Sequence, residues 1–135
     1  MESTLQHPFR ASAVGVRWLK IAVVYFIIGV SLGIGMGATQ NFTLRPVHAH
    51  LNLLGWATLA LAGIIYTLFP KAGESRLGIA HFWLHNLSLP IMMVSLALLL
   101  FGHSEAIPAL QVGEMMAFAA VLLFAVNVFT NVKRT

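Results

Sequence analysis

The sequence has no cysteine and very little charge. Without cysteine in its 135 residues, the chain has no disulfide, no thiolate metal site and no cysteine nucleophile. Charged residues make up 9% of the chain, whereas a soluble domain is roughly 25% charged. Hydrophobic residues make up 59%, so the composition indicates a membrane protein, and the length indicates one domain, residues 1–135.

The formal net charge of +4 does not indicate a nucleic-acid partner. The eight basic residues are scattered among predicted loops and termini and form no basic face. Charge of this kind more often sets the orientation of a protein in a membrane, since cytoplasmic loops are enriched in lysine and arginine. Membrane lipid is therefore the expected surrounding, and no nucleic-acid binding is expected.

Four long apolar runs follow one another along the chain. They predict helices over roughly 17–37, 47–69, 77–101 and 110–128. About 20 residues of helix cross roughly 30 Å of hydrocarbon. The first run lacks a signal-peptide cleavage pattern, so it is read as a retained span. Short connections require neighbouring helices to be antiparallel. The fold class is therefore all-α, an integral membrane four-helix bundle with up-down topology.

The basic residues predict the orientation of this bundle. On one side of the predicted topology lie Arg10, Arg17, Lys20, Lys71, Arg76, Lys133 and Arg134, and on the other lies Arg45. This asymmetry places both termini in the cytoplasm. The second helix then begins at the outer face, and His48 lies near that face.

The first helix carries Gly29, Gly33 and Gly37, which form two overlapping G-x-x-x-G pairs. This spacing lets another backbone approach closely. Helix packing is the favoured interpretation, and a groove for a flat cofactor is the alternative.

His48 and His50 are the first candidate ligands, because histidine inside a membrane is costly unless it is paired or metal-bound. Two residues apart on a helix, their side chains project roughly 200° apart, so they serve two sites rather than chelating one ion. Asn52, one turn beyond His48, is placed to orient its ring. Arg45 is placed to pair with an anionic group such as a haem propionate. The alternative is a pair of interfacial histidines bonded to neighbours.

His81 and His85 are the second candidate pair. Their i, i+4 spacing puts them on one helix face and suits a shared metal such as copper or zinc. We expect this pair to lie on the order of 15 Å deeper than His48 and His50, given roughly 30 Å of hydrocarbon. For His81 an interfacial anchor beside Trp83 is favoured over a ligand, and for His85 the two interpretations are balanced.

The stretch Val47-His48-Ala49-His50-Leu51-Asn52-Leu53-Leu54-Gly55-Trp56, running on to Tyr66 and Phe69-Pro70, resembles the tenth helix of the catalytic subunit of haem-copper oxidases. C-type oxidases and their nitric oxide reductase relatives look closest, and Ala80-His81-Phe82-Trp83-Leu84 resembles the start of their next helix. The resemblance covers about 45–90. It implies haem b, with His48 on a high-spin and His50 on a low-spin haem. It also implies a redox or gas-binding role in a bacterial inner membrane.

The chain departs from that family in size. The catalytic subunit has twelve helices in three arcs of four, and its copper site uses three histidines from helices that have no counterpart in this chain. A homotrimer of this chain would reproduce this arrangement of twelve helices. His50 of one copy and His48 of the next would then lie on either side of one haem. A copper- or zinc-binding membrane protein and a cofactor-free structural or assembly subunit remain the alternatives. Turnover by a single chain is not evident.

Overall fold

The computed structural model describes residues 11–133, and this part of the chain is helical, without a β-strand. His7, Arg10 and Arg134 lie outside the described residues. The elements in order are α1 (Ala13–Thr39), α2 (Arg45–His50), the π-helix η1 (Leu51–Ala57), α3 (Thr58–Leu68), α4 (Pro70–Glu74), α5 (Arg76–Leu100), the 3₁₀ turn η2 (Ser104–Ala106) and α6 (Ile107–Asn131).

Four helical segments are long and apolar enough to cross a membrane. They are Ala13–Thr39, Arg45–Leu68, Arg76–Leu100 and Ser104–Asn131, with 27, 24, 25 and 28 residues. The first begins four residues before its predicted start, and the last ends three residues after its predicted end. Hydropathy marks only the apolar centre of a span, whereas helical hydrogen bonding continues into its polar ends.

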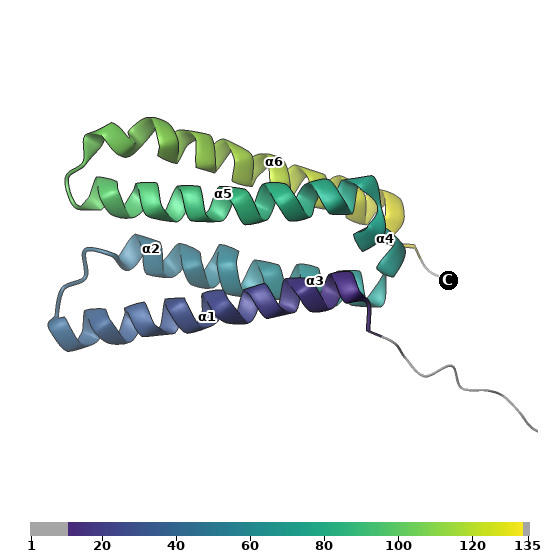
Figure 1. Ribbon diagram of the computed structural model, residues 1–135, viewed down its shortest axis with the longest axis horizontal. Coiled ribbons are helices and arrows are strands. Elements are labelled where there is room, and N and C mark those ends of the chain that lie inside the picture. Colours follow the sequence, from purple (N-terminus) through teal and green to yellow (C-terminus); the bar gives the residue numbers. More distant parts are fainter. Residues whose placement is uncertain (1–10, 134–135) are drawn as a thin grey trace, which may run out of the picture.

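The second span is one rod made of three pieces, α2, η1 and α3. Figure 1 shows the start of α1, the short helix α4 and the end of α6 gathered at one end of the molecule, called here the α4 end. The connections at 40–44 and 101–103 lie at the opposite end, called here the Arg45 end. Helix α1 packs along the second span, and α5 packs along α6.

Local chemistry explains where the spans begin and end. Gln40 has a φ of 54° and donates from Nε2 to the Gly37 carbonyl at 2.6 Å, which closes the end of α1. Pro70 occupies the first position of α4, where its missing N–H costs nothing. The Ser75 hydroxyl accepts a hydrogen bond from the Gly78 N–H at 3.0 Å, so it caps the start of α5.

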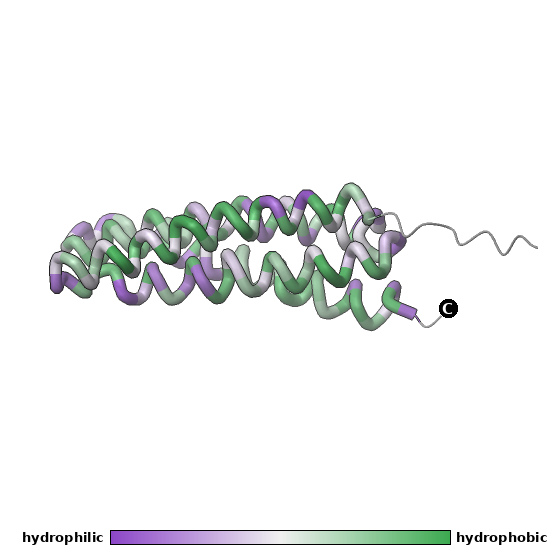
Figure 2. Tube along the Cα trace, turned by 90° about the horizontal axis from the view of Figure 1, so that it is seen from below, coloured by the Kyte–Doolittle hydropathy of each residue, from purple (hydrophilic) through white to green (hydrophobic). Residues whose placement is uncertain are grey.

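The core and the outer surface are both largely apolar. Trp18, Leu59, Tyr66 and Leu89 are almost completely buried. Exposed large side chains include Ile34, Leu53, Leu61, Val94 and Phe129. Hydrophobic residues run along the length of the helices in Figure 2. Lipid contact accounts for this surface, because a water-soluble protein rarely exposes apolar patches of this extent.

Candidate functional site

The Arg45 end of the second span carries an unpaired cation. A hydrogen-bonded turn precedes it, in which the Thr43 N–H and hydroxyl both donate to Asn41 Oδ1. The Arg45 guanidinium lies 5.3 Å from the centre of the Phe42 ring, an exposed cation–π contact. Within residues 11–133 no carboxylate pairs with Arg45. The guanidinium is therefore free to bind an anion.

His48 packs against α1, with its ring beside Gly29 and Gly33. Its Nδ1 lies 2.8 Å from the Gly29 carbonyl oxygen. A Cβ added at Gly33 would stand 2.8 Å from Cε1 of His48 and 3.6 Å from its Nε2. Because Gly33 has no side chain, it leaves room for the ring. Gly29 and Gly33 thus accept side chains of the second span, as helix packing requires. Gly37 has nothing within 4 Å of an added Cβ among the described residues, so the second predicted pair, Gly33/Gly37, makes no such close approach.

Asn52 shares this contact but does not act on the His48 ring as expected. Its Nδ2 donates to the His48 carbonyl at 2.8 Å and lies 3.4 Å from the ring Nδ1. The Gly29 carbonyl is the nearer partner of the ring, so it is the group that orients His48. A Cβ at Gly29 would lie 2.7 Å from the Asn52 amide nitrogen. Asn52 therefore fills the space beside Gly29 and fixes the backbone of His48.

His50 is held by its own helix. Its Nδ1 lies 2.7 Å from the Pro46 carbonyl, one turn earlier. A carbonyl oxygen only accepts, so Nδ1 of both His48 and His50 carries the proton. This tautomer leaves a lone pair on Nε2 of each ring. Metal-ligating histidines characteristically donate their other ring N–H in this way, which fixes the ring and raises the basicity of the free nitrogen.

A π-helical turn follows the two histidines directly. In η1 the Thr58 N–H and hydroxyl both donate to the Leu53 carbonyl, five residues earlier. Short π segments inside α-helices occur frequently at functional sites. The Leu54 carbonyl of this turn also accepts a hydrogen bond from Nε2 of His85 at 3.0 Å. The π turn therefore connects the second span to α5.

His85 of α5 is bonded to the second span. Its partner Leu54 is four residues beyond His50, which is about 6 Å along a helix axis at 1.5 Å per residue. His85 is 3% exposed, and its Nδ1 has no hydrogen-bond partner among the described residues. Its lone pair is therefore on Nδ1, inside the core.

His81 is a core residue, so its side chain does not face outward as an interfacial anchor would. It is 1% exposed, whereas its neighbour Trp83 is 59% exposed. Trp18 of α1 stacks on His81 with 4.6 Å between ring centres and also contacts His85 at 5.9 Å. The physical reason is helix geometry: the face shared by His81 and His85 points inward, and Trp83 points away from it.

A buried hydrogen-bond network surrounds His81. The Asn127 amide donates to the Tyr66 hydroxyl at 3.1 Å, and that hydroxyl lies 2.8 Å from Nδ1 of His81. The Tyr66 hydroxyl accepts from Asn127, so its own proton is available to donate to Nδ1 of His81. Nδ1 is then the acceptor, and His81 carries its proton on Nε2. In this tautomer neither nitrogen offers a lone pair to a metal. Metal binding by His81 and His85 together, which remains a prediction, would require the network to rearrange.

The structure thus separates the candidate residues into two groups. Arg45, His48, His50 and Asn52 lie together at the Arg45 end. His81 and His85 belong to the core, and among residues 11–133 no group of three His, Asp or Glu is placed to hold a metal ion. Sequence reasoning missed the contributions of Trp18 and of Tyr66 bonded to Asn127. Tyr66 and Asn127 are 61 residues apart, so no local pattern reveals their contact.

Comparisons with known protein families, with curated proteins and with solved structures give no match. The candidate site is therefore interpreted from its own geometry.

Proposed function

We propose that this chain is a haem b-binding integral membrane protein with a redox or gas-ligand-binding role. The observation that carries the proposal is the donor set of the second span. His48 and His50 each have Nδ1 on a main-chain carbonyl and a lone pair on Nε2, the state in which imidazole binds iron. The bound haem would supply an iron that takes up one electron or a small gas.

Arg45 supports the same proposal. It lies on the first turn of the helix that carries both histidines, and no carboxylate pairs with it in the described part of the chain. A haem at this level would bring propionates, whose geometry suits the planar guanidinium. In this proposal His48 and His50 bind iron, Arg45 binds a propionate and Asn52 holds the backbone of His48.

The proposed topology is an up-and-down antiparallel bundle in a bacterial inner membrane, with both termini in the cytoplasm. Short connections support the antiparallel order. Within the described residues Arg17, Lys20, Lys71, Arg76 and Lys133 belong to segments at or next to the α4 end, whereas Arg45 starts the second span at the other end. This distribution favours a cytoplasmic α4 end.

We further propose that the haem lies between copies of the chain in a homotrimer. His48 contacts α1, and His50 projects about 200° away around the same helix. One chain therefore offers one ring to each side of its second span. Two imidazoles on one haem then require His50 of one copy and His48 of a neighbouring copy, which gives one haem per chain in a closed trimer.

A reduced-minus-oxidised visible spectrum of the purified, haem-supplied protein tests the proposal. We expect a Soret band that shifts on reduction and a haem content near one per chain. His50→Ala should lose the low-spin spectrum. His103→Ala is the matched control, because His103 lies exposed in a loop and pairs with Glu105 at 3.0 Å. A spectrum unchanged in His50→Ala, or no Soret band in the parent protein, would contradict haem binding.

Copper or zinc binding is the second candidate, and His85 is the observation that favours it. Its Nε2 is fixed on the Leu54 carbonyl, and its buried Nδ1 has no partner among the described residues. Because Nδ1 of His85 is buried, a metal there would need a local opening of the core as well as further ligands. Metal analysis of the purified protein and of His85→Leu distinguishes this candidate from haem binding. In His85→Leu the copper or zinc content should fall, and the haem spectrum should not change.

A further inference from the structure

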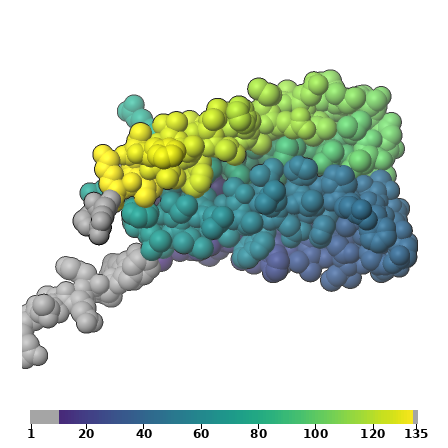
Figure 3. Space-filling view, turned by 180° about the vertical axis from the view of Figure 1, so that it is seen from behind, coloured from purple at the N-terminus to yellow at the C-terminus, as the bar shows by residue number. Residues whose placement is uncertain are grey.

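A hollow of about 500 Å³ lies at the α4 end, between the α3–α4 connection and the last turn of α6. Figure 3 shows the end of α6, in yellow, lying beside the teal segment that contains the end of α3. The residues that line it are Leu68, Phe69, Pro70, Lys71, Thr130, Asn131 and Lys133. The haem proposal assigns no role to this hollow.

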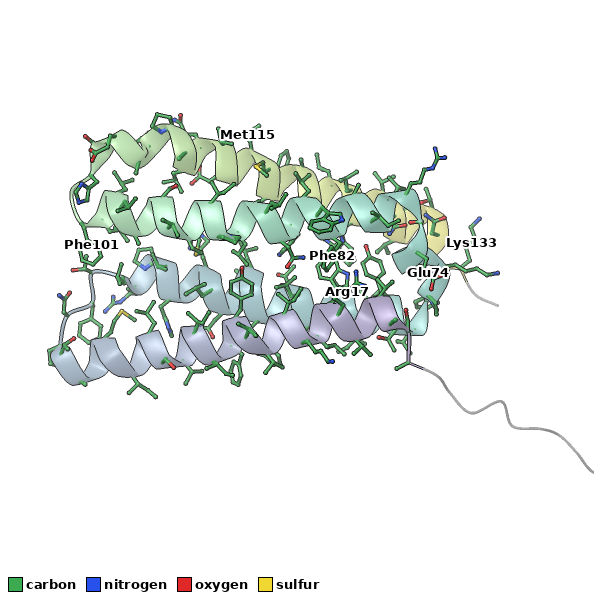
Figure 4. The ribbon with its side chains drawn as sticks, in the orientation of Figure 1. Arg17, Glu74, Phe82, Phe101, Met115 and Lys133 are labelled. Atoms are coloured by element: carbon green, nitrogen blue, oxygen red, sulfur yellow. The ribbon has the colours of Figure 1, made fainter. Side chains whose placement is uncertain are left out.

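The polar groups of the hollow are donors without anionic partners. Lys71 and Lys133 are both exposed, and no carboxylate lines the hollow. The single ion pair among residues 11–133 joins His103 to Glu105, and both lie at the Arg45 end. Figure 4 shows Lys133 extending from the α4 end. Both lysines therefore line this space without a carboxylate partner among the described residues.

Asn131 adds a further donor. One N–H of its amide donates to Asn127 Oδ1 at 2.7 Å, and the other has no bond assigned to it. Thr130 donates its hydroxyl to the Val126 carbonyl at 2.7 Å, so it adds no free donor. Each lysine carries three N–H donors and no acceptor, so the side chains of the hollow recognise an anionic group rich in oxygen, such as a phosphate.

The remaining lining is apolar, which identifies the kind of molecule that carries the phosphate. Leu68, Phe69 and Pro70 end the second span, and Leu68 is 58% exposed on a surface that contacts lipid. A free phosphate would leave this apolar part in contact with water. A phospholipid fills both parts, with its headgroup on the lysines and its acyl chain along Leu68. Basic pockets between transmembrane helices bind anionic lipid headgroups elsewhere.

We infer that this hollow binds an anionic phospholipid, with the phosphate between Lys71 and Lys133. A second hollow of about 290 Å³ at the same end shows the contrast, because it is lined by both Arg17 and Glu74 and so does not select for an anion. Arg17 and Glu74 are labelled in Figure 4. The inference does not depend on haem.

Binding at this hollow would also act on the core. Asn131 is bonded to Asn127, which bonds to the Tyr66 hydroxyl and to the Ala72 carbonyl at 2.9 Å. A lipid that orders Lys71 and Asn131 therefore holds together the ends of α3, α4 and α6. The lipid should stabilise the folded chain, since a ligand that binds only the folded state raises its stability by mass action.

The test uses the full chain in neutral detergent at 150 mM salt, with dioleoyl phosphatidylglycerol or phosphatidylcholine added. Native mass spectrometry gives the occupancy, and thermal unfolding gives the stabilisation. We expect phosphatidylglycerol to bind about 30-fold more tightly, which is about 2 kcal/mol at 1.4 kcal/mol per tenfold and about 1 kcal/mol for each lysine. Lys71→Gln with Lys133→Gln should abolish this preference.

Two further variants separate the effect of the hollow from the effect of charge alone. Lys20→Gln with Arg76→Gln removes the same charge outside the hollow, and it should retain the preference. Thr130→Trp narrows the hollow without changing the charge, and it should also lose the preference. Equal binding of both lipids, or equal loss in the two charge-matched double variants, would overturn the inference.

Discussion

Adding one methyl group at Gly33, by the substitution Gly33→Ala, should displace the His48 ring of the candidate site. A Cβ there would lie 2.8 Å from Cε1 of His48, whereas an ordinary carbon–carbon contact begins near 3.5 Å. Gly35, on the same helix, has nothing within 4 Å of its added Cβ. Gly33→Ala and Gly35→Ala are therefore a matched pair: the same substitution in the same helix, with one contact different.

The structure gives the size of the effect. In Gly33→Ala the His48 ring must retreat by about 0.7 Å to restore an ordinary contact. A retreat directed away from α1 lengthens its bond to the Gly29 carbonyl, now 2.8 Å, beyond the usual 3.2 Å limit, and the bond is lost. Such a bond contributes about 1 kcal/mol. The gain in helix propensity, also about 1 kcal/mol, is common to both variants and cancels in the comparison.

Unfolding in mixed micelles measures the difference between the two variants. We expect Gly33→Ala to be less stable than Gly35→Ala by about 1 kcal/mol. The haem spectrum gives a second readout, because a displaced His48 ring turns Nε2 away from its present direction. Gly35→Ala should keep the parent spectrum, and Gly33→Ala should change it. Equal stability and equal spectra in the two variants would refute the packing of His48 on α1.

Two further predictions concern the buried network. Asn127→Ala should cost about 2–3 kcal/mol of unfolding free energy, since Asn127 makes four side-chain bonds and such bonds average about 0.6 kcal/mol in membrane proteins. Asn86→Ala is the control: its amide makes one bond, to Phe82 at 2.8 Å, and an equal cost for both variants would contradict this account. Tyr66→Phe should cost about 1–2 kcal/mol because it removes one donor and one acceptor. Its cost should not add to that of Asn127→Ala in a double-mutant cycle, and full additivity would show that the two side chains are uncoupled.

The sequence predicted the parts of this protein that depend on composition and periodicity. Four apolar runs gave four helices of membrane-spanning length because hydropathy and helix length are local properties. The opposed directions of His48 and His50 follow from residue spacing alone, and in the structure the two rings bond to different carbonyls, those of Gly29 and Pro46. The G-x-x-x-G spacing at Gly29 and Gly33 likewise indicated the close approach that the second span makes.

Tertiary structure decided the groups that depend on contacts between distant segments. The bond from His85 to Leu54 and the burial of His81 under Trp18 both join separate spans. The π-helical turn lies within the second span and is connected to α5 through that bond. Asn127 bonds to Tyr66, a partner 61 residues away that no local pattern reveals. A side chain's direction follows from its own helix, but its partner depends on which other helix packs there, and only the folded chain determines that.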